Sequence, residues 1–451
     1  HFGVMARAYW ILQELEGDSD PEGYVGKKTG VRLVNFSAKR DMPQFNRMVD
    51  APFANQMPSG SITPLNDSIG YHGPGKIGVE MVSPPLSRSY PRLLPGLGHA
   101  VLGGGEGAQQ SQVQLEFSEQ GAGHPHADCM GITWFAHGRE ASGDIGYQRN
   151  KLRSWSAGSL SHNTVVVNGG NQQLHRDTFG DVQFFVDSLP GISTIQVDAP
   201  DAYADGILSR YRRTLLHVTT DPAKPYFIDV FEVHGGRQHD YAIHGNLEGH
   251  DRGSASLELK KMAGERPLLP KGQKWKEPAK SGASFNHYGL FKNVSTAAMK
   301  PSAYVDFVDK KSGVGTRIHL PMSEGTFYLG ETPGLRRAGH YNDKAVYDDW
   351  MPHFIVRRNG AAGLKSVFVA VYDMHGGKPA VSSVERIKVN AETVALEIQA
   401  GSRIDAFVLQ LEEKGKVEFG SLKTDARVAF AQDIKGKTSL WMIEGTSLAA
   451  G

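Results

Sequence analysis

The sequence predicts a mainly β protein: a large antiparallel β-sandwich, preceded by a helical segment and followed by a smaller β domain. Beyond about residue 95 helical periodicity almost disappears, and short β-branched and aromatic runs alternate with Gly, Pro, Asn and Asp turns. The first 17 residues instead place apolar side chains at helical spacing. A chain of 451 residues is too long for one ordinary core, so two or three domains are expected.

The elements follow in order along the chain. Gly17 ends the first helical pattern, and a second short helical stretch covers 42–57. A connector rich in Gly, Pro, Ser and Asn then leads into the strands, among them QVQLEF, TVVV, RRTLLHV and YFIDVFEV. The last part of the chain has the length of a compact sandwich. We therefore place the domains at 1–70, 71–335 and 336–451.

Composition narrows the functional classes. Hydrophobic residues make up 39% and charged residues 22%, with a formal net charge of +1 at pH 7. This balance is typical of globular proteins and gives no indication of a nucleic-acid or membrane partner. No apolar run is long enough to span a bilayer. The single cysteine, Cys129, excludes an internal disulfide framework and a set of zinc fingers.

The segment Gly121–Phe135 carries His124, His126 and Asp128 at every second position. If it enters a strand, these three side chains share one face at intervals of about 6.5–7 Å. Unpaired polar groups inside a sandwich cost about 1–3 kcal/mol each, so the pattern indicates a site. The alternative is a polar strand face open to water.

Two later residues add to this pattern. Asp144 ends the next run in SGDIGY, and His162 opens the following strand in SHNTVVVNG. Two histidines and a carboxylate from three successive strand ends suit a tetrahedral zinc-type site, with water as the fourth ligand.

Three motifs together resemble the heparinase II/III-like polysaccharide lyases. They are HPHAD at 124–128, GREASGDIGY at 138–147 and SHNTVVVNGG at 161–170. The opening HFGVMARAYW is similar to the last helices of that family's (α/α) toroid, and residues 209–218 and 226–233 resemble its later sandwich strands. The resemblance therefore implies the end of a toroid, a connector, the central sandwich and a C-terminal β domain.

The resemblance implies β-elimination on uronic-acid polysaccharides. This reaction neutralises the uronate carboxylate, removes the C5 proton and protonates the leaving O4. By position, His124 is the sandwich histidine of the catalytic set. One divalent metal, expected to be zinc, would be held by His126, Asp144 and His162, and would hold the loops in place rather than act on substrate. No organic cofactor is expected.

The catalytic tyrosine of the family is expected at or before the start of this chain, together with the toroid Asn or His that neutralises the carboxylate. The missing toroid segment is therefore an expected partner. Tyr9 is the nearest helical tyrosine, with packing as the alternative. Tyr147, three residues after Asp144, is the candidate at the rim of the site, with packing under the turn as its alternative.

Four further residues are candidates for substrate binding. Arg153 offers a planar fork to a carboxylate or sulfate, unless it only stacks on Trp155. The other three, with ordinary turn roles as alternatives, are Tyr71, His72 and His244.

The substrate class follows from the resemblance. A glycosaminoglycan such as heparan, chondroitin or hyaluronan is favoured by the Arg and Lys residues near 149–153 and 209–213, and alginate is the alternative. Such a substrate implies a periplasmic or secreted protein, and a homodimer is compatible with the sequence. A non-catalytic carbohydrate-binding sandwich is a second reading. A non-haem iron oxygenase using His126, Asp128 and His162 is the least favoured.

Overall fold

The structure is a computed structural model. It describes the whole chain except residues 1–7, 9, 44–53, 69–87, 122, 205, 337, 339–340, 413–414, 420–421, 435 and 451. The chain divides into two compact units, one formed by 1–63 and 69–88, the other by 64–68 and 89–451. Within the described residues no helix has the length and apolarity needed to cross a membrane.

The first unit contains little regular structure among its described residues. Residues 10–14 are helical, as predicted, and a short helix α2 (Ala38–Asp41) begins where the Ser37 side chain accepts a hydrogen bond from the Arg40 backbone N–H. The predicted helix over 42–57 lies mostly outside the described residues. The same is true of Tyr9, Tyr71 and His72.

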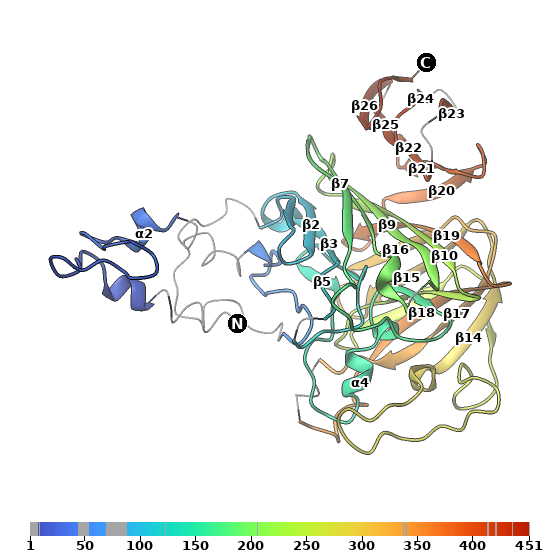
Figure 1. Ribbon diagram of the computed structural model, residues 1–451. Coiled ribbons are helices and arrows are strands. Elements are labelled where there is room, and N and C mark those ends of the chain that lie inside the picture. The colour runs from blue at the N-terminus through green and yellow to red at the C-terminus, as the bar shows by residue number, and fades with distance from the viewer. Residues whose placement is uncertain are drawn as a thin grey trace. The chain divides into compact units, whose positions relative to one another are not determined.

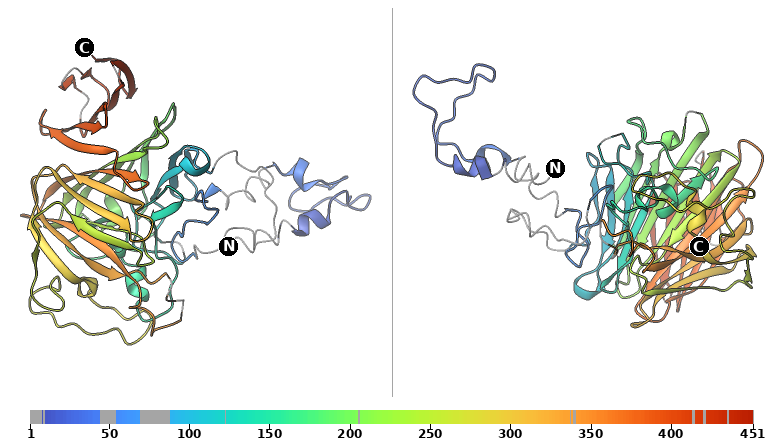
Figure 2. Two further views of the ribbon diagram at one scale, coloured as in Figure 1. Left: turned by 180° about the vertical axis from the view of Figure 1, so that it is seen from behind. Right: turned by 90° about the horizontal axis from the view of Figure 1, so that it is seen from below.

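The second unit is built on two large antiparallel sheets (Figures 1 and 2). The eight-stranded sheet has the order β12 (Asp251–Ala255), β15 (Ala303–Asp309), β16 (Gly315–Leu320), β19 (Lys365–His375), β10 (Tyr226–Gly235), β9 (Leu208–Val218), β8 (Ile192–Asp198) and β7 (Asp181–Leu189). The six-stranded sheet has the order β13 (Lys260–Lys261), β14 (Lys292–Ala298), β17 (Thr326–Pro333), β18 (Trp350–Asn359), β11 (Gln238–His244) and β6 (Thr164–Val167).

A five-stranded sheet precedes them in the chain. Its order is β1 (Arg92–Leu94), β2 (His99–Gly104), β3 (Ser111–Glu116), β4 (Ile132–Ala136) and β5 (Arg139–Ser142). All three sheets share one core, in which Trp134 of β4 meets Tyr372 of β19 at 5.2 Å between ring centroids. Tyr241 of β11 stacks on Phe368 of β19 at 5.3 Å. The predicted mainly β sandwich is confirmed.

The eight-stranded sheet is buried on both faces because its side chains alternate between two cores. Phe231 points into the central core, while its neighbour Val230 packs in a second core with the C-terminal strands. The C-terminal strands form two sheets, coloured orange to dark red in Figure 1. The first sheet has the order β20 (Val381–Ile387), β21 (Thr393–Ala400), β22 (Arg403–Gln410), β25 (Val428–Ile434) and β26 (Lys437–Ile443). The second sheet has the order β23 (Val417–Phe419), β24 (Leu422–Thr424) and β27 (Leu448–Ala450).

The predicted domain boundary at residue 335 divides these sheets. The strands β18 and β19 come after it, yet β18 pairs with β11 and β17, and β19 pairs with β10 and β16. The sandwich therefore continues to His375, and the C-terminal domain begins with β20. The boundary could not be predicted from local composition, because composition does not record which strands pair over long sequence distances.

Candidate metal centre and active site

The loop that carries the histidines is not the strand that the sequence predicts. Residues before Ile132 are irregular, and Met130 has a positive φ of 64°. Backbone hydrogen bonds fix the loop instead, from Ala127 N to Ala157 O at 2.9 Å and from Met130 N to Glu116 O at 2.7 Å. The prediction of a strand was wrong because the segment bends to bury His126 and Asp128 together.

Four buried side chains meet where this loop, the end of β5 and the start of β6 converge: His126, Asp128, Asp144 and His162. One potential ligand atom from each lies within 4.8 Å of all the others. Asp144 Oδ2 lies 3.4 Å from His162 Nε2, and its Oδ1 lies 3.9 Å from His126 Nδ1. The structure thus brings together the three predicted ligands and adds Asp128.

The two imidazoles are oriented as metal ligands require. His126 Nδ1 and His162 Nε2 are buried and have no hydrogen-bond partner among the described residues. The opposite ring nitrogens are occupied, His126 Nε2 by Asp67 Oδ1 at 3.0 Å and His162 Nδ1 by Gly158 O at 2.9 Å. Such acceptors hold the proton on the far nitrogen, so the lone pairs of both rings face the cluster. The donor set fits a divalent metal with nitrogen and oxygen ligands.

The charges in the cluster are strongly coupled. Burial alone would raise the pKa of Asp144, but the charge of His162, whose Nε2 lies 3.4 Å away, outweighs it and lowers the pKa to about 2. Burial disfavours a charged His162, yet Asp144 raises the pKa of His162 to about 9. Burial raises the pKa of Asp128 well above its usual value. A cation bound here would replace the histidine proton and stabilise both carboxylates.

His124 lies beside this cluster but at the surface, with its side chain 66% exposed. Its Nδ1 is 3.0 Å from Asp67 Oδ2, and its backbone carbonyl accepts a hydrogen bond from Asp67 N at 3.2 Å. Among the described residues nothing else hydrogen-bonds the ring, so Nε2 is available to solvent or substrate. Its φ of 69° is a left-handed conformation that the loop imposes.

Asp67 connects the surface histidine to the buried cluster. It contacts His124 and His126, and it forms an ion pair with Arg153 at 2.6 Å. Burial alone would raise the pKa of Asp67, but the hydrogen bond from His126 and the charge of Arg153 outweigh it, and the pKa is lowered. Neighbouring Asn66 accepts the backbone N–H of His126 at 2.9 Å. Asp67 is therefore the central residue of the site.

Tyr147 is half-buried next to this group, in agreement with its predicted place. The guanidinium of Arg153 lies 5.6 Å from the centre of its ring, and Arg149 Nε donates a hydrogen bond to its hydroxyl. Arg149 also donates to the hydroxyl of Tyr341 at 3.0 Å, and Tyr341 is 72% exposed. Gly146 lets the backbone next to Tyr147 approach Ser68, because a Cβ there would lie 2.7 Å from Ser68 O, which accepts the Tyr147 N–H at 3.1 Å.

His244 does not lie at a rim. It is fully buried, with Nδ1 2.9 Å from Gly245 O and its ring 5.7 Å from that of His353. The prediction that it contacts substrate is therefore corrected: His244 packs behind the cluster. Its position at the end of β11 put it near the site, but its ring lies among buried groups, with Nδ1 3.3 Å from Ser142 Oγ.

The arginines near 209–213 are not a basic surface for substrate. Arg213 is completely buried, and two of its guanidinium nitrogens donate to Asp229 at 2.9 and 2.6 Å. Arg210 and Arg212 pair with acidic residues of the sandwich and the C-terminal domain. This support for a glycosaminoglycan substrate is withdrawn.

The sequence interpretation missed Asp67, Asn66 and Tyr341, and it counted Asp128 as a ligand only in the iron oxygenase alternative. Asp128 had a usable signal, since it continues the alternation of His124 and His126. Asn66 and Asp67, the adjacent polar pair in PLNDS, gave a weaker signal, because no local sequence pattern indicates that residue 67 lies next to residue 124 in the fold.

Comparisons with known proteins agree with this fold. The family model described as heparinase II/III-like, C-terminal, matches residues 91–323, slightly more than half of the chain. The structure is similar to the heparan sulfate lyase HepC from Pedobacter heparinus, with a TM-score of 0.58 and 13% identity over 84% of this chain and 55% of that one. It is also similar to a heparinase III, with a TM-score of 0.56 and 14% identity over 91% and 59%.

The chain spans a little over half the length of these two lyases. No curated protein sequence matches it.

Proposed function

Because this chain belongs to the heparinase II/III-like family, we propose that the protein is a polysaccharide lyase that cleaves a uronic-acid polysaccharide by β-elimination. The observation that carries the proposal is an exposed imidazole, His124, held by the buried carboxylate of Asp67 at 3.0 Å. An imidazole fixed in this way presents a free nitrogen at the surface, which is the group that proton transfer to or from a polymer needs.

The chemistry requires more than one group. The C5 proton is a weak acid while the neighbouring carboxylate is charged, so cations or hydrogen-bond donors must stabilise the developing negative charge. We assign proton transfer to His124. The guanidinium groups of Arg149 and Arg153 lie 5.1 and 5.6 Å from the ring centre of Tyr147, which is the candidate acid for the leaving oxygen. Groups from the toroid are expected to complete the set, so Tyr9 remains a candidate.

Tyr341 and Arg149 are suited to hold a sugar. An exposed tyrosine offers an apolar ring face with a polar tip, and the guanidinium beside it offers paired donors to a carboxylate. Arg149 replaces His244 in our assignment of substrate contacts. Arg153 also forms an ion pair with Asp67, which holds His124, so we expect Arg153 to orient His124 as well as to contact substrate.

The proposed metal is zinc, held by His126, Asp144 and His162 with Asp128 as the added carboxylate. A closed set of four protein ligands is typical of structural zinc. Here it would join three loops and keep His124 at the surface. The oxygenase reading is disfavoured, because that chemistry needs open positions on the metal, whereas four protein ligands would fill a tetrahedral shell.

A glycosaminoglycan is the proposed substrate, and heparan sulfate is the first polymer to test, because the similar HepC structure is that of a heparan sulfate lyase. Alginate is the alternative uronate. Either substrate implies a periplasmic or secreted protein.

The test is the ultraviolet absorbance of the unsaturated uronate, recorded on mixing the protein with heparan sulfate, chondroitin sulfate, hyaluronan or alginate. The full-length gene product is assayed beside this 451-residue chain. A rise with one polymer identifies the substrate, and a rise only with the longer protein shows that upstream groups are essential. Retention of sugar without any rise in either protein would favour a binding module.

The variant His124→Ala is expected to abolish the absorbance rise while leaving the metal content unchanged. The matched control is His175→Ala, since His175 is another exposed histidine, 63% exposed, paired with an aspartate at 3.3 Å. Full turnover by the His124 variant would remove it from the mechanism.

A further inference from the structure

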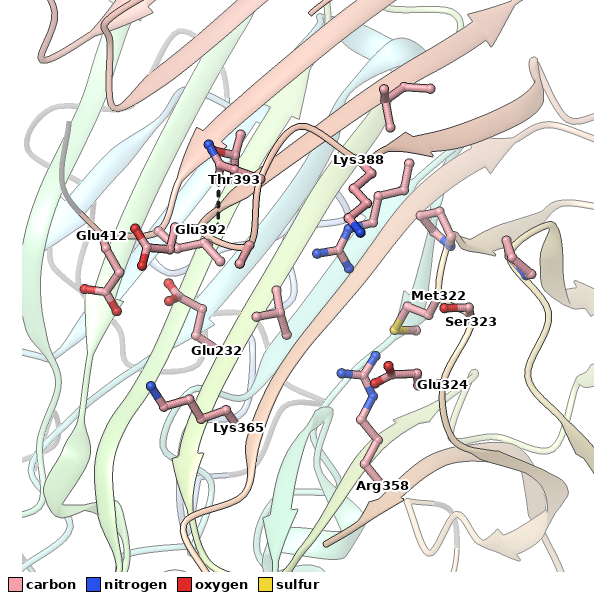
Figure 3. A pocket seen from close by; sticks show the side chains of 18 of the residues that line it. Glu232, Met322, Ser323, Glu324, Arg358, Lys365, Lys388, Glu392, Thr393 and Glu412 are labelled. Atoms are coloured by element: carbon pink, nitrogen blue, oxygen red, sulfur yellow. Dashed lines mark hydrogen bonds between the residues drawn. The ribbon is translucent and has the colours of Figure 1, made fainter. Parts of the chain in front are cut away.

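A second candidate site lies between the sandwich and the C-terminal domain, within the same compact unit (Figure 3). It is a cavity of about 560 Å³. Its walls come from β10, the loop 321–324, the ends of β18 and β19, and the segment 386–393. This volume is within the range of about 300–1,000 Å³ that is usual for sites of small ligands.

Two arginines on these walls lack a close counter-charge. Among the described residues, neither Arg358 nor Arg386 has a carboxylate within ion-pair distance, and Arg358 Nε is buried without a hydrogen-bond acceptor. The guanidinium of Arg358 lies 4.9 Å from the ring centre of Phe368, which holds it in place. Burial lowers the pKa of both arginines, and the exposed carboxylate of Glu324 only partly offsets this. Positive charge that is only partly compensated in such a position favours an anion.

The carboxylates of the cavity do not neutralise these arginines. Glu232 and Glu412 both approach Arg210, at 3.5 and 2.5 Å. Figure 3 shows Glu232, Glu392 and Glu412 grouped apart from Arg358 and Lys388. The cavity therefore has an acidic end, whose carboxylates approach Arg210, and a basic end, where Glu324 stands against Arg358, Arg386 and Lys388.

The cavity is separate from the candidate active site. On β18, His353 pairs with His244 behind the metal cluster, whereas Arg358 pairs with His239 at the other end of β11. The five residue steps from His353 to Arg358 correspond to about 17 Å along the strand.

We propose that this cavity binds a sulfate or carboxylate group of an acidic saccharide, with Arg358, Arg386 and Lys388 as the binding residues. Arginine forks match the planar or tetrahedral oxygens of such groups with paired, charge-assisted hydrogen bonds. No Phe, Tyr or Trp is among the described residues that line the cavity, so recognition depends on charge rather than on stacking against a large aromatic ring. The side chains of Ser323, Asn390 and Thr393 add donors and acceptors suited to sugar hydroxyls.

The test is calorimetric titration with a size-defined heparan sulfate hexasaccharide and, separately, with inorganic sulfate. It is performed on His124→Ala protein, so that the sugar remains intact. The double variant Arg386→Gln/Lys388→Gln should weaken hexasaccharide binding at one class of site by about tenfold or more, because charged hydrogen bonds are lost. The charge-matched control is Arg252→Gln/Lys310→Gln, two exposed residues outside this cavity, and should bind as the parent does.

Equal binding by the two double variants would overturn the proposal. So would binding of inorganic sulfate without binding of the hexasaccharide at the same residues. If the Arg386 variant loses its cooperative thermal transition, the single change of exposed Lys388→Gln serves instead, with the same expected direction. The ultraviolet assay is independent of this site, so failure of lyase activity and failure of this site are distinguishable.

Discussion

At the scale of single residues, the candidate site depends on one carboxylate. Asp67 holds the Nδ1 of His124 and the Nε2 of His126, so a single side chain fixes both the exposed ring and a proposed metal ligand. Arg153 neutralises it from the third side at 2.6 Å. The two imidazole rings therefore point in different directions, one to the surface and one to the buried cluster, because the same carboxylate binds both.

The change Asp67→Asn tests this arrangement. An amide keeps one acceptor oxygen but turns two donors toward the imidazoles, so the orientation of both rings is disturbed. We expect turnover to fall about 10–100-fold, as is typical when an outer partner of a ligand histidine is removed. Steady-state kinetics should locate the loss mainly in kcat. The control Asp177→Asn alters the exposed His175–Asp177 pair and should leave kcat unchanged; an unaltered kcat in the Asp67 variant would contradict the assignment.

A second residue-scale prediction concerns the metal. His126→Ala should lose the bound metal, because a ligand and its Asp67 contact are both removed. Since a metal that binds only the folded state stabilises it, the thermal midpoint should fall and should no longer respond to chelator. Elemental analysis measures the content. Normal metal content in this variant would refute the ligand assignment.

At the scale of elements, buried hydrogen bonds hold the loops of the site onto the strands. Arg213 of β9 donates to the carbonyls of Met130 and Asn163, at 2.5 and 2.7 Å, and both carbonyls are next to the cluster. Its charge is balanced by Asp229 of β10, which also accepts from Tyr241 at 2.7 Å. The position of the site loops is thus set by the centre of the sandwich.

Removing that arginine should be costly. Arg213→Met leaves the buried carboxylate of Asp229 unpaired, and we expect a loss of about 3–5 kcal/mol in the free energy of unfolding. Urea unfolding measures it. Arg317→Met removes a more exposed pair with Asp306 and should cost about 1 kcal/mol or less. Similar losses in the free energy of unfolding of both variants would contradict the proposed role of Arg213 in holding the site loops.

At the scale of the whole molecule, the C-terminal domain is attached through buried polar groups as well as through apolar packing. Tyr226 of β10 donates to Asp405 of β22 at 2.5 Å. Asp373, near the end of β19, accepts from the backbone N–H of Val381, the first residue of β20, at 2.8 Å. Burial raises the pKa of Asp373 to about 7.

This predicts a pH dependence of stability with a definite sign. The folded protein keeps the Asp373 proton up to about pH 7, whereas an unfolded aspartate releases it near about pH 4. The stabilisation is therefore fully present below about pH 4 and is lost as the pH rises to about 7. The stability of Asp373→Asn minus that of the parent protein should therefore increase from about pH 4 to about pH 7 and stay constant above about pH 7. Thermal unfolding of both proteins from pH 4 to 8 checks this, and parallel curves would contradict it.

Local sequence patterns were sufficient for the class of the fold and for the position of the site. Turn-separated β-branched runs predicted the sandwich, because strand propensity and turn chemistry are local properties. The spacing of His126, Asp144 and His162 at strand ends marked the cluster that the structure brings within 4.8 Å. The predicted ligands meet in the structure even though most of the predicted strand at 121–135 is a bent loop.

The tertiary structure decided which residues meet across long sequence distances. It paired Asp67 with His124, 57 residues apart, placed β18 and β19 inside the sandwich, and buried Arg213 where the sequence suggested a basic surface. It also buried His244 and left Tyr341 exposed. The physical reason is that burial and ion pairing depend on the packing of whole sheets, whereas periodicity records only the preferences of neighbouring residues.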